Sequence, residues 1–404
     1  MAAVAHQTKQ VQGMDSLDDH IQERMNDVSM RGAGFYNSNS ALQAAAATRC
    51  LPLLDINPGS GLAEDKQSHQ LFTVVEYGSA QGSNSVAPMK RILDSMPHPC
   101  PENHGRGQDR LQVQLVFSDR PQNDFASLAK TISEIPWMEP KAGDTDISEA
   151  TPSVFPTMVA RNFYERVMPT QSVDVGFSFA SLHHLNQLPP PAPPATSLEG
   201  EQERMVVRKA RFREQARHDL EHFLSLRAEE LKPGAQLVLS FSSAASSGAP
   251  NFAPWALSLW MSILDMVGAG RIPALVSQKF DVPTYDRSLN DVRQTLDAVR
   301  HFWSVEQIFE DEIEHPAVEM LLGTKADDDA MRAEYADVTV RWLMAVVSGY
   351  FIKALRQGFG EPLDPEQEAN LLRDLTDRVR ARILRDHSNE RLTCWFIYIK
   401  LIRI

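Results

Sequence analysis

Two glycines and a carboxylate stand where a nucleoside could bind. Gly78 and Gly82 follow the apolar residues 71–77, and Asp119 follows the apolar residues 111–117. Glycine lets the backbone approach a ligand closely, and a carboxylate after a second strand can accept two hydrogen bonds from a ribose. The spacing is GxxxG, whereas dinucleotide sites have GxGxxG. Together these residues favour a nucleoside ligand without a pyrophosphate, such as S-adenosylmethionine (SAM). Taken singly, they also fit a strand–helix turn and a helix N-cap.

His183 and His184 follow a third apolar segment, residues 172–179. Adjacent histidines are poor metal ligands unless a carboxylate or cysteine lies nearby at helical spacing, and the sequence offers none here. No metal site is therefore predicted. Two interpretations remain for this pair: side chains that line a polar pocket, or ordinary histidines with protein partners.

A parallel sheet would bring these residues together, because its ligands bind at the carboxyl ends of the strands, where the strand order reverses. Apolar, β-branched runs separated by helical patterns predict this βαβα arrangement over the first 245 residues. The runs are residues 71–77, 111–117, 172–179 and 235–241. The expected fold class is therefore α/β, with a Rossmann-like, mostly parallel sheet.

The second half of the chain is mostly helical. Helical patterns cover residues 254–270, 286–301 and most of 315–388, and strand-like runs return at 302–309 and 392–404. We interpret this half as an inserted helical cap, with late strands that complete the sheet. The expected organisation is a flexible N-terminus at 1–20, a cofactor-binding core at 21–250, a cap at 251–390 that includes a late core strand near 302–309, and a C-terminal core strand at 391–404.

Composition argues against several kinds of partner. The formal net charge is −13 over 404 residues, and clustered Lys and Arg are needed to hold phosphate backbones, so no nucleic-acid partner is expected. The three cysteines match no zinc pattern. We find no signal-like apolar run at the N-terminus and no apolar segment of about 18 residues. We therefore expect a cytoplasmic protein without a membrane span.

Six segments resemble, in order, motifs of the SABATH family (salicylate, benzoate and theobromine methyltransferases), which are SAM-dependent carboxyl and N-methyltransferases. The segments, each with the motif that it resembles, are Tyr36–Gln43 (SYAxNSxxQ), Glu76–Asn84 (DLGCSSGPN), Phe117–Phe125 (NDLPxNDFN), Asn162–Pro169 (SFYxRLFP), Ser181–Pro189 (SLHWLSQVP) and Phe280–Tyr285 (FNxPxY). Six motifs in family order are specific. The chain is identified as a divergent, microbial or fungal member.

The resemblance implies a Rossmann-like methyltransferase with a helical cap, SAM as cofactor and a homodimer. It implies that Asp119 contacts the ribose of SAM and that Phe163 lies near the adenine. The residues expected around SAM are Tyr36, Ser40, Glu76, Gly78, Gly82, Asn84, Asp119, Asn162 and Phe163. Those expected at the acceptor are Tyr36, Gln43, His183, His184 and Trp255, the last as part of a roof with Trp260 and Met261. At helical spacing such roof residues are more often core.

Three departures from the motifs bear on the site. Glu76 replaces an Asp, Asn162 replaces a Ser, and His184 replaces a Trp whose indole N–H helps to hold the substrate carboxylate. An imidazole N–H can also donate, so the last change leaves carboxylate binding feasible while it removes an aromatic wall.

A carboxylic acid is the acceptor that these residues favour. Its pKa near 4 leaves it ionised at pH 7, so no general base is needed, and Gln43 and His184 would act as orienting donors. A polar site favours a short acid, for example a dicarboxylic acid such as fumarate. The alternatives are N-methylation of a small heterocycle and a catalytically inactive dimeric binding module.

Overall fold

The computed structural model describes residues 28–56, 71–96, 111–137, 152–190, 198–322 and 329–404. The predicted flexible segment 1–20 lies outside the described residues.

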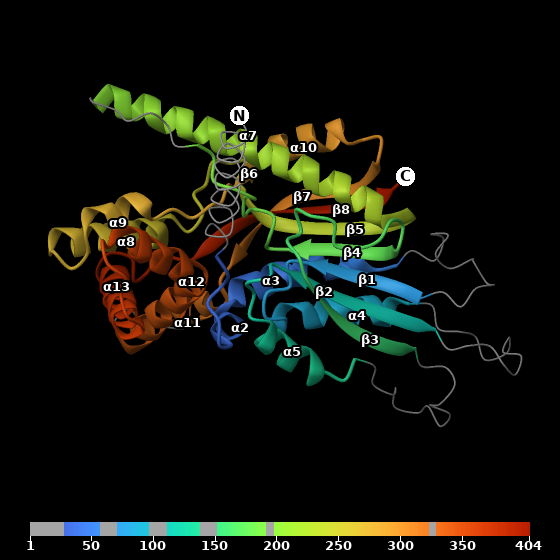
Figure 1. Cartoon of the computed structure of the whole chain (residues 1–404), viewed down its shortest axis with the longest axis horizontal. Helices are drawn as coiled ribbons and strands as arrows, with labels where there is room; N and C mark the ends of the chain where they lie inside the picture. Colours follow the sequence, from blue (N-terminus) through green and yellow to red (C-terminus); the bar gives the residue numbers. More distant parts are fainter. Residues whose placement is uncertain (1–27, 57–70, 97–110, 138–151, 191–197, 323–328) are drawn as a thin grey trace, which may run out of the picture.

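An eight-stranded sheet, mostly parallel, forms the centre of the molecule (Figure 1). Its order is β3-β2-β1-β4-β5-β8-β7, and the short β6 pairs with β5. The first five strands in the chain run parallel, and β7 and β8 are antiparallel to their neighbours. The bounds are Leu71–Tyr77 (β1), Gln112–Asp119 (β2), Ser153–Ala160 (β3), Val173–Phe179 (β4), Leu231–Ala244 (β5), Arg287–Ser288 (β6), Trp303–Glu314 (β7) and Thr393–Arg403 (β8). This confirms the predicted fold class.

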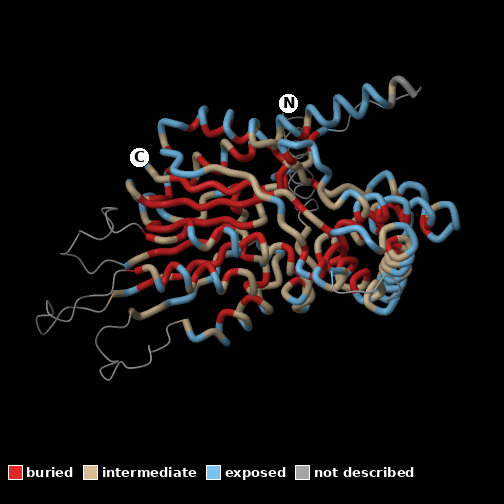
Figure 2. The backbone as a smooth tube through the Cα atoms, turned by 180° about the vertical axis from the view of Figure 1, so that it is seen from behind, coloured by how far each residue is buried: buried red, intermediate tan, exposed pale blue. Residues whose placement is uncertain are grey.

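The strand order reverses between β1 and β4. Val75 of β1 pairs with Val116 of β2 on one side and with Gly176 of β4 on the other. Every residue of β4 is buried, because helices cover both faces of the parallel sheet. Its sequence is mostly apolar, and the carboxylate of its Asp174 accepts hydrogen bonds from Lys232 Nζ and Thr73 N. Figure 2 shows these buried strands as the core of the molecule. A ligand site is therefore expected at the carboxyl ends of β1, β2 and β4.

The sequence interpretation did not include β3. This strand lies at the edge of the sheet, contains Pro156, and leaves Phe155 and Met158 exposed. Proline is tolerated at an edge because one side of the strand needs no ladder hydrogen bond. The sequence of β3 is as apolar as that of the inner strands, but a proline inside an apolar run argues against a strand of the sheet interior.

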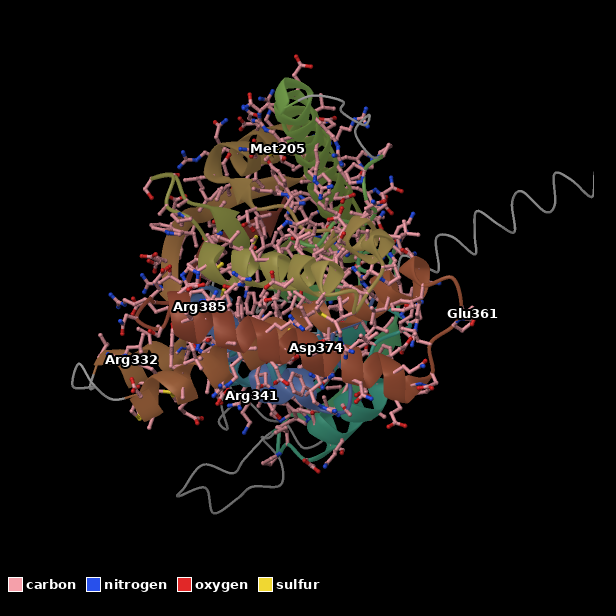
Figure 3. All side chains as sticks on the ribbon, turned by 90° about the vertical axis from the view of Figure 1, so that its left-hand side faces the viewer. Met205, Arg332, Arg341, Glu361, Asp374 and Arg385 are labelled. Atoms are coloured by element: carbon pink, nitrogen blue, oxygen red, sulfur yellow. The ribbon has the colours of Figure 1, made fainter. Side chains whose placement is uncertain are left out.

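Helices cover both faces of the sheet and form two cores. One core includes side chains of α3 (Ala41–Cys50), α4 (Val86–Ser95) and α5 (Phe125–Ser133). The other includes side chains of α7 (Leu198–Glu230) and α10 (Leu289–Ala298). The first half of α7 extends beyond the sheet, and its Met205 is 69% exposed (Figures 1 and 3).

A helical cap lies beyond the carboxyl ends of the parallel strands (Figure 1). It consists of α8 (Ala253–Gly268), α9 (Ala274–Lys279), α11 (Glu319–Leu322), α12 (Asp329–Gly358) and α13 (Pro365–Asp386). Asp364 and Gln367 form a capping box that begins α13. Charged residues of the cap, such as Arg341, Asp374 and Arg385, lie on its outer surface (Figure 3).

Helix α12 is the central helix of the cap. By length and composition α12 could cross a membrane. The expectation that the chain contains no apolar segment of this length was therefore wrong. Its most apolar stretch is 67% buried inside the domain, as is typical of the core helix of a globular protein.

Candidate active site

The loop after β1 approaches the loop after β4 so closely that only glycine fits at position 78. Gly78 has a φ of +96°, and a Cβ there would lie 2.5 Å from Ser181 Oγ. The N–H groups of Gly78 and Ser79 donate to the carbonyl oxygen of Ser118, at 2.8 and 3.0 Å, which ties the loop to the end of β2. Gly78 therefore serves this close approach, whereas a Cβ on Gly82 would lie 2.7 Å from Leu128 of α5.

Asp119 ends β2 and faces the same loop. Its Oδ2 accepts a hydrogen bond from Ala80 N at 2.6 Å, and its Oδ1 accepts one from Arg120 N at 2.8 Å. The N-cap of α5 is Asp124, which accepts from Ser127 N. The helix-cap alternative for Asp119 therefore does not apply.

Glu76 is a buried acid at the end of β1. It is 4% exposed, and its Oε2 has no hydrogen-bond partner among the described residues. Burial raises the pKa of Glu76 to about 8, so its neutral form predominates at pH 7. Burial, and then the negative charges of Asp119 and Glu76, raise the pKa of Tyr36, which places this phenol beside both carboxyl groups.

The short helix α2 (Phe35–Asn39) is held against the glycine loop through Asn37. The amide nitrogen of Asn37 donates to the carbonyl oxygen of Gln81 at 3.0 Å, and its Oδ1 accepts from Ser83 N at 3.2 Å. Tyr36 and the following helix α3, which carries Gln43, are thereby brought over the carboxyl ends of the strands.

The two histidines lie on the loop after β4. Their ring centroids are 4.4 Å apart, and neither Nδ1 has a hydrogen-bond partner among the residues described. Burial lowers the pKa of His183 to about 4 and that of His184 well below its ordinary value, so both rings are neutral at pH 7. Tyr285 N donates to the carbonyl oxygen of His183, and Arg287 Nη1 donates to that of Leu182, which fixes the loop.

Most of the predicted site residues line one cavity at the carboxyl ends of the strands. Of the predicted residues, the lining includes Tyr36, Gln43, Glu76, Gly78, Gly82, Asn84, Asp119, Phe163, His183 and His184. Two others stand just outside it: Ser40 Oγ accepts a hydrogen bond from the Asn84 amide, and Asn162 Oδ1 accepts one from Tyr164 N. The structure therefore unites residues from five of the six motifs.

Trp255 is not at the cavity. It is fully buried in the cap, where its ring packs edge-on against Tyr335. Trp260 and Met261 lie on the exposed side of the same helix, α8. The idea that these residues roof the pocket is therefore wrong, because the face of α8 that carries Trp255 packs into the cap core.

Sequence reasoning missed several lining residues. Arg120 and Asn123 belong to the third motif, which could have pointed to them. The positive charge of Arg120 contributes to the lowered pKa of His184, so this guanidinium lies near the imidazole. Val346 and Tyr350 lie on α12, where nothing in an apolar helical pattern distinguishes a lining residue from a core residue.

Phe163 is held beside the glycine loop by a buried charge network. Arg227 Nη1 donates to the carbonyl oxygen of Phe163 at 2.7 Å, and Arg227 Nη2 donates to Glu230 Oε1 at 2.9 Å. The hydroxyl of Tyr77 donates to Glu230 Oε2 at 2.8 Å. The end of β1, the loop around Phe163 and α7 are therefore joined. In the part of the chain that the structure describes, no group of three or more His, Cys, Asp or Glu could hold a metal ion.

Comparison with known proteins gives a consistent result. A family model described as SAM dependent carboxyl methyltransferase matches residues 24–389. Methyltransferase LUC1 of a Fusarium species is 40% identical over 94% of this chain and 98% of its own length. Indole-3-acetate O-methyltransferase 1 of Oryza sativa subsp. japonica is 31% identical over 66% of this chain and 69% of its own. A solved loganic acid methyltransferase with SAH has a TM-score of 0.66 at 18% identity, over 93% of this chain and 98% of that one, and so shares the fold.

Proposed function

We propose that this protein, which belongs to the family of SAM-dependent carboxyl methyltransferases, esterifies a small, polar carboxylic acid. The family confirms the resemblance drawn from the six motifs, and with it SAM as cofactor and methyl transfer as reaction. One observation carries the choice of acceptor. Gln43 and His184, two side chains able to donate to a carboxylate, line the same cavity as the glycine loop and Asp119.

The residues around the glycine loop fit SAM. Gly78 and Gly82 line the cavity together with Asp119, and the buried Oε2 of Glu76 has no partner within the described residues. A buried carboxyl oxygen without a partner suits a ligand that carries positive charge and amino N–H groups. When bound, SAM supplies an electrophilic methyl group. We propose that Tyr36, Glu76, Gly78, Gly82, Asn84, Asp119 and Phe163 surround it.

Asp119 would accept hydrogen bonds from the ribose, and Phe163 would lie near the adenine. Ser40 and Asn162 would act indirectly, because neither lines the cavity. Ser40 is hydrogen-bonded to Asn84, which does, and Asn162 precedes Phe163 and accepts a hydrogen bond from Tyr164 N.

The acceptor needs positioning rather than proton transfer. A carboxylic acid is already ionised at pH 7, so the protein has only to hold one oxygen in line for attack and to exclude water. Such positioning contributes about 7–11 kcal/mol to lowering a barrier. We assign it to the amide N–H groups of Gln43 and the imidazole N–H of His184. The low pKa of His184 leaves its ring neutral, with one nitrogen as a donor.

The polarity of the cavity supports a small acid that carries further polar groups. The neutral imidazoles of His183 and His184 and the guanidinium of Arg120 line it. A short dicarboxylic acid such as fumarate, methylated at one or both ends, suits these groups better than benzoate does. The homodimer and the cytoplasmic location expected from the sequence are further proposals.

Turnover of SAM with a labelled methyl group, offered with a panel of acids, tests this function. We expect labelled methyl esters of short polar acids, with benzoate a poorer substrate. Gln43→Ala should raise the KM for the acid about tenfold or more, because it removes hydrogen bonds to a charged group, and should leave the Kd for SAM unchanged. Asp119→Ala should instead weaken SAM binding, measured by calorimetry.

Two outcomes would contradict the proposal. Methyl transfer to a ring nitrogen that is insensitive to Gln43→Ala would favour N-methylation of a heterocycle. Binding of SAM without turnover of any acceptor would favour a binding module.

A further inference from the structure

Trp342 of the cap forms a hydrogen bond with Gln43 of the core. Its indole Nε1–H donates to Gln43 Oε1 at 3.1 Å, between residues 299 positions apart. Trp342 is 6% exposed and does not line the cavity, whereas Gln43 does. The indole therefore lies behind Gln43, seen from the cavity.

This bond determines which end of the Gln43 amide faces which way. An indole N–H can only donate, and a glutamine amide has one oxygen that accepts and one nitrogen that donates. With Oε1 turned to Trp342, Nε2 is directed elsewhere, and it has no hydrogen-bond partner among the residues that the structure describes.

We infer that Trp342 is a positioning residue that orients the Gln43 amide so that its N–H groups face the acceptor carboxylate. The inference rests on the proposed function. If the amide were flipped, its oxygen would face the carboxylate and repel it, because both groups accept hydrogen bonds. A residue of the cap thereby determines that the N–H groups of Gln43 on α3, rather than its oxygen, face the acceptor.

The indole ring is held in place by its neighbours in the cap. Its centroid lies 5.8 Å from that of Phe252, at an interplanar angle of 70°, and 6.3 Å from that of His315, also at 70°. Burial lowers the pKa of His315 to about 4, so this ring is neutral at pH 7 and adds no charge beside the indole. These contacts leave the Nε1–H directed at Gln43.

The substitution Trp342→Phe separates orientation from packing, because it keeps an aromatic ring and removes the N–H. We expect a rise of about tenfold in the KM for the acid, corresponding to the loss of one oriented hydrogen bond, with the Kd for SAM unchanged. Trp303→Phe is the matched control. Trp303 is also buried and donates through Nε1 to a carbonyl oxygen, that of Leu224, but lies on β7 away from the cavity. Its KM for the acid should match the wild type.

A double-mutant cycle distinguishes the orientation of Gln43 by Trp342 from a merely structural role of Trp342. Gln43→Ala should raise KM in the wild type and add little in the Trp342→Phe background, because both changes remove the same oriented donor. Additive effects of the two substitutions would overturn the inference.

If Trp342→Phe does not fold, Gln43→Glu tests the donor role of Gln43, on which the inference depends. This nearly isosteric change preserves an oxygen for Trp342 and replaces the N–H groups with a second oxygen, so the KM for the acid should rise at least as much as in Gln43→Ala. A wild-type KM in Trp342→Phe, beside a wild type that esterifies acids, would overturn the inference alone. A wild-type KM in Gln43→Glu would overturn the inference and also the assignment of Gln43 to the acceptor. A wild type that esterifies no acid would overturn the proposed function as well.

Discussion

The pKa values of several residues in the cavity are shifted so that their neutral forms are favoured at pH 7. Burial raises the pKa of Glu76 to about 8 and lowers that of His183 to about 4, and both shifts favour the neutral form at pH 7. For His183 and His184 neutrality means one donor nitrogen each. For Glu76 it means that a proton must leave before the side chain can pair with a cationic ligand.

The affinity for SAM should therefore rise with pH in the free protein. A ligand with positive charge selects the ionised form of Glu76, which is the minor form below a pKa of about 8. The Kd for SAM should fall by up to about tenfold per pH unit as the pH rises from 6 to 8, and should level off above pH 8. Calorimetry across this range measures the effect. Glu76→Gln, which cannot ionise, is the control and should have a flatter profile; equal slopes in the two proteins would contradict the role of Glu76.

At the scale of elements, the site depends on loops from separate strands that meet at van der Waals distance. The loop after β1 contacts the loop after β4 through Gly78 and Ser181, and it is bonded to the end of β2 through Ser118. The C-terminal end of α7 adds the buried Arg227–Glu230 pair, which reaches the loop of Phe163. Removing one partner of such a pair typically costs about 3–5 kcal/mol, because it leaves a buried charge without compensation.

Gly78→Ala should destabilise the protein more than another substitution of a glycine with positive φ. An alanine at such a φ costs about 1–2 kcal/mol, and the contact with Ser181 adds about 1–3 kcal/mol of overpacking. Gly234→Ala is the matched control, because Gly234 has a φ of +81° but no atom within 4 Å of its Cβ position. Denaturant unfolding measures both free energies. Equal losses would show that the two loops do not pack as described.

At the scale of the molecule, the last strand of the chain is internal to the sheet. β8 lies between β5 and β7 and pairs with both, so Ile399 faces Leu239 on one side and Ile308 on the other. The cavity also depends on distant parts of the chain, because Val346 and Tyr350 of α12 line it together with the ends of the parallel strands. Core and cap therefore form the site jointly.

Deletion of residues 393–404 should prevent folding. It would leave β5 paired on one side only, with β4, detach β7 and expose the apolar side chains that β8 covers. Far-UV circular dichroism and size-exclusion chromatography of the truncated chain measure the loss. Deletion of Ile404 alone, which is exposed, is the control and should leave a folded protein. A cooperative unfolding transition in the longer deletion would refute this dependence.

The sequence by itself determined the parallel sheet and the residues at its strand ends. Runs such as 173–179 are buried on both faces and therefore mostly apolar, and Gly78 and Asp119 stand at the ends of β1 and β2 where the pattern predicted them. The division into core and cap at residue 250 stays a prediction.

Only the tertiary structure decided which way side chains of the cap face. Trp255 and Trp342 both belong to apolar helices, yet one packs into the cap core and the other reaches Gln43. Local periodicity shows that a helix has a buried face, but the partner of each side chain depends on contacts between segments far apart in the chain. For the same reason the edge strand β3 and the approach of Arg120 to His184 could be read only from the folded protein.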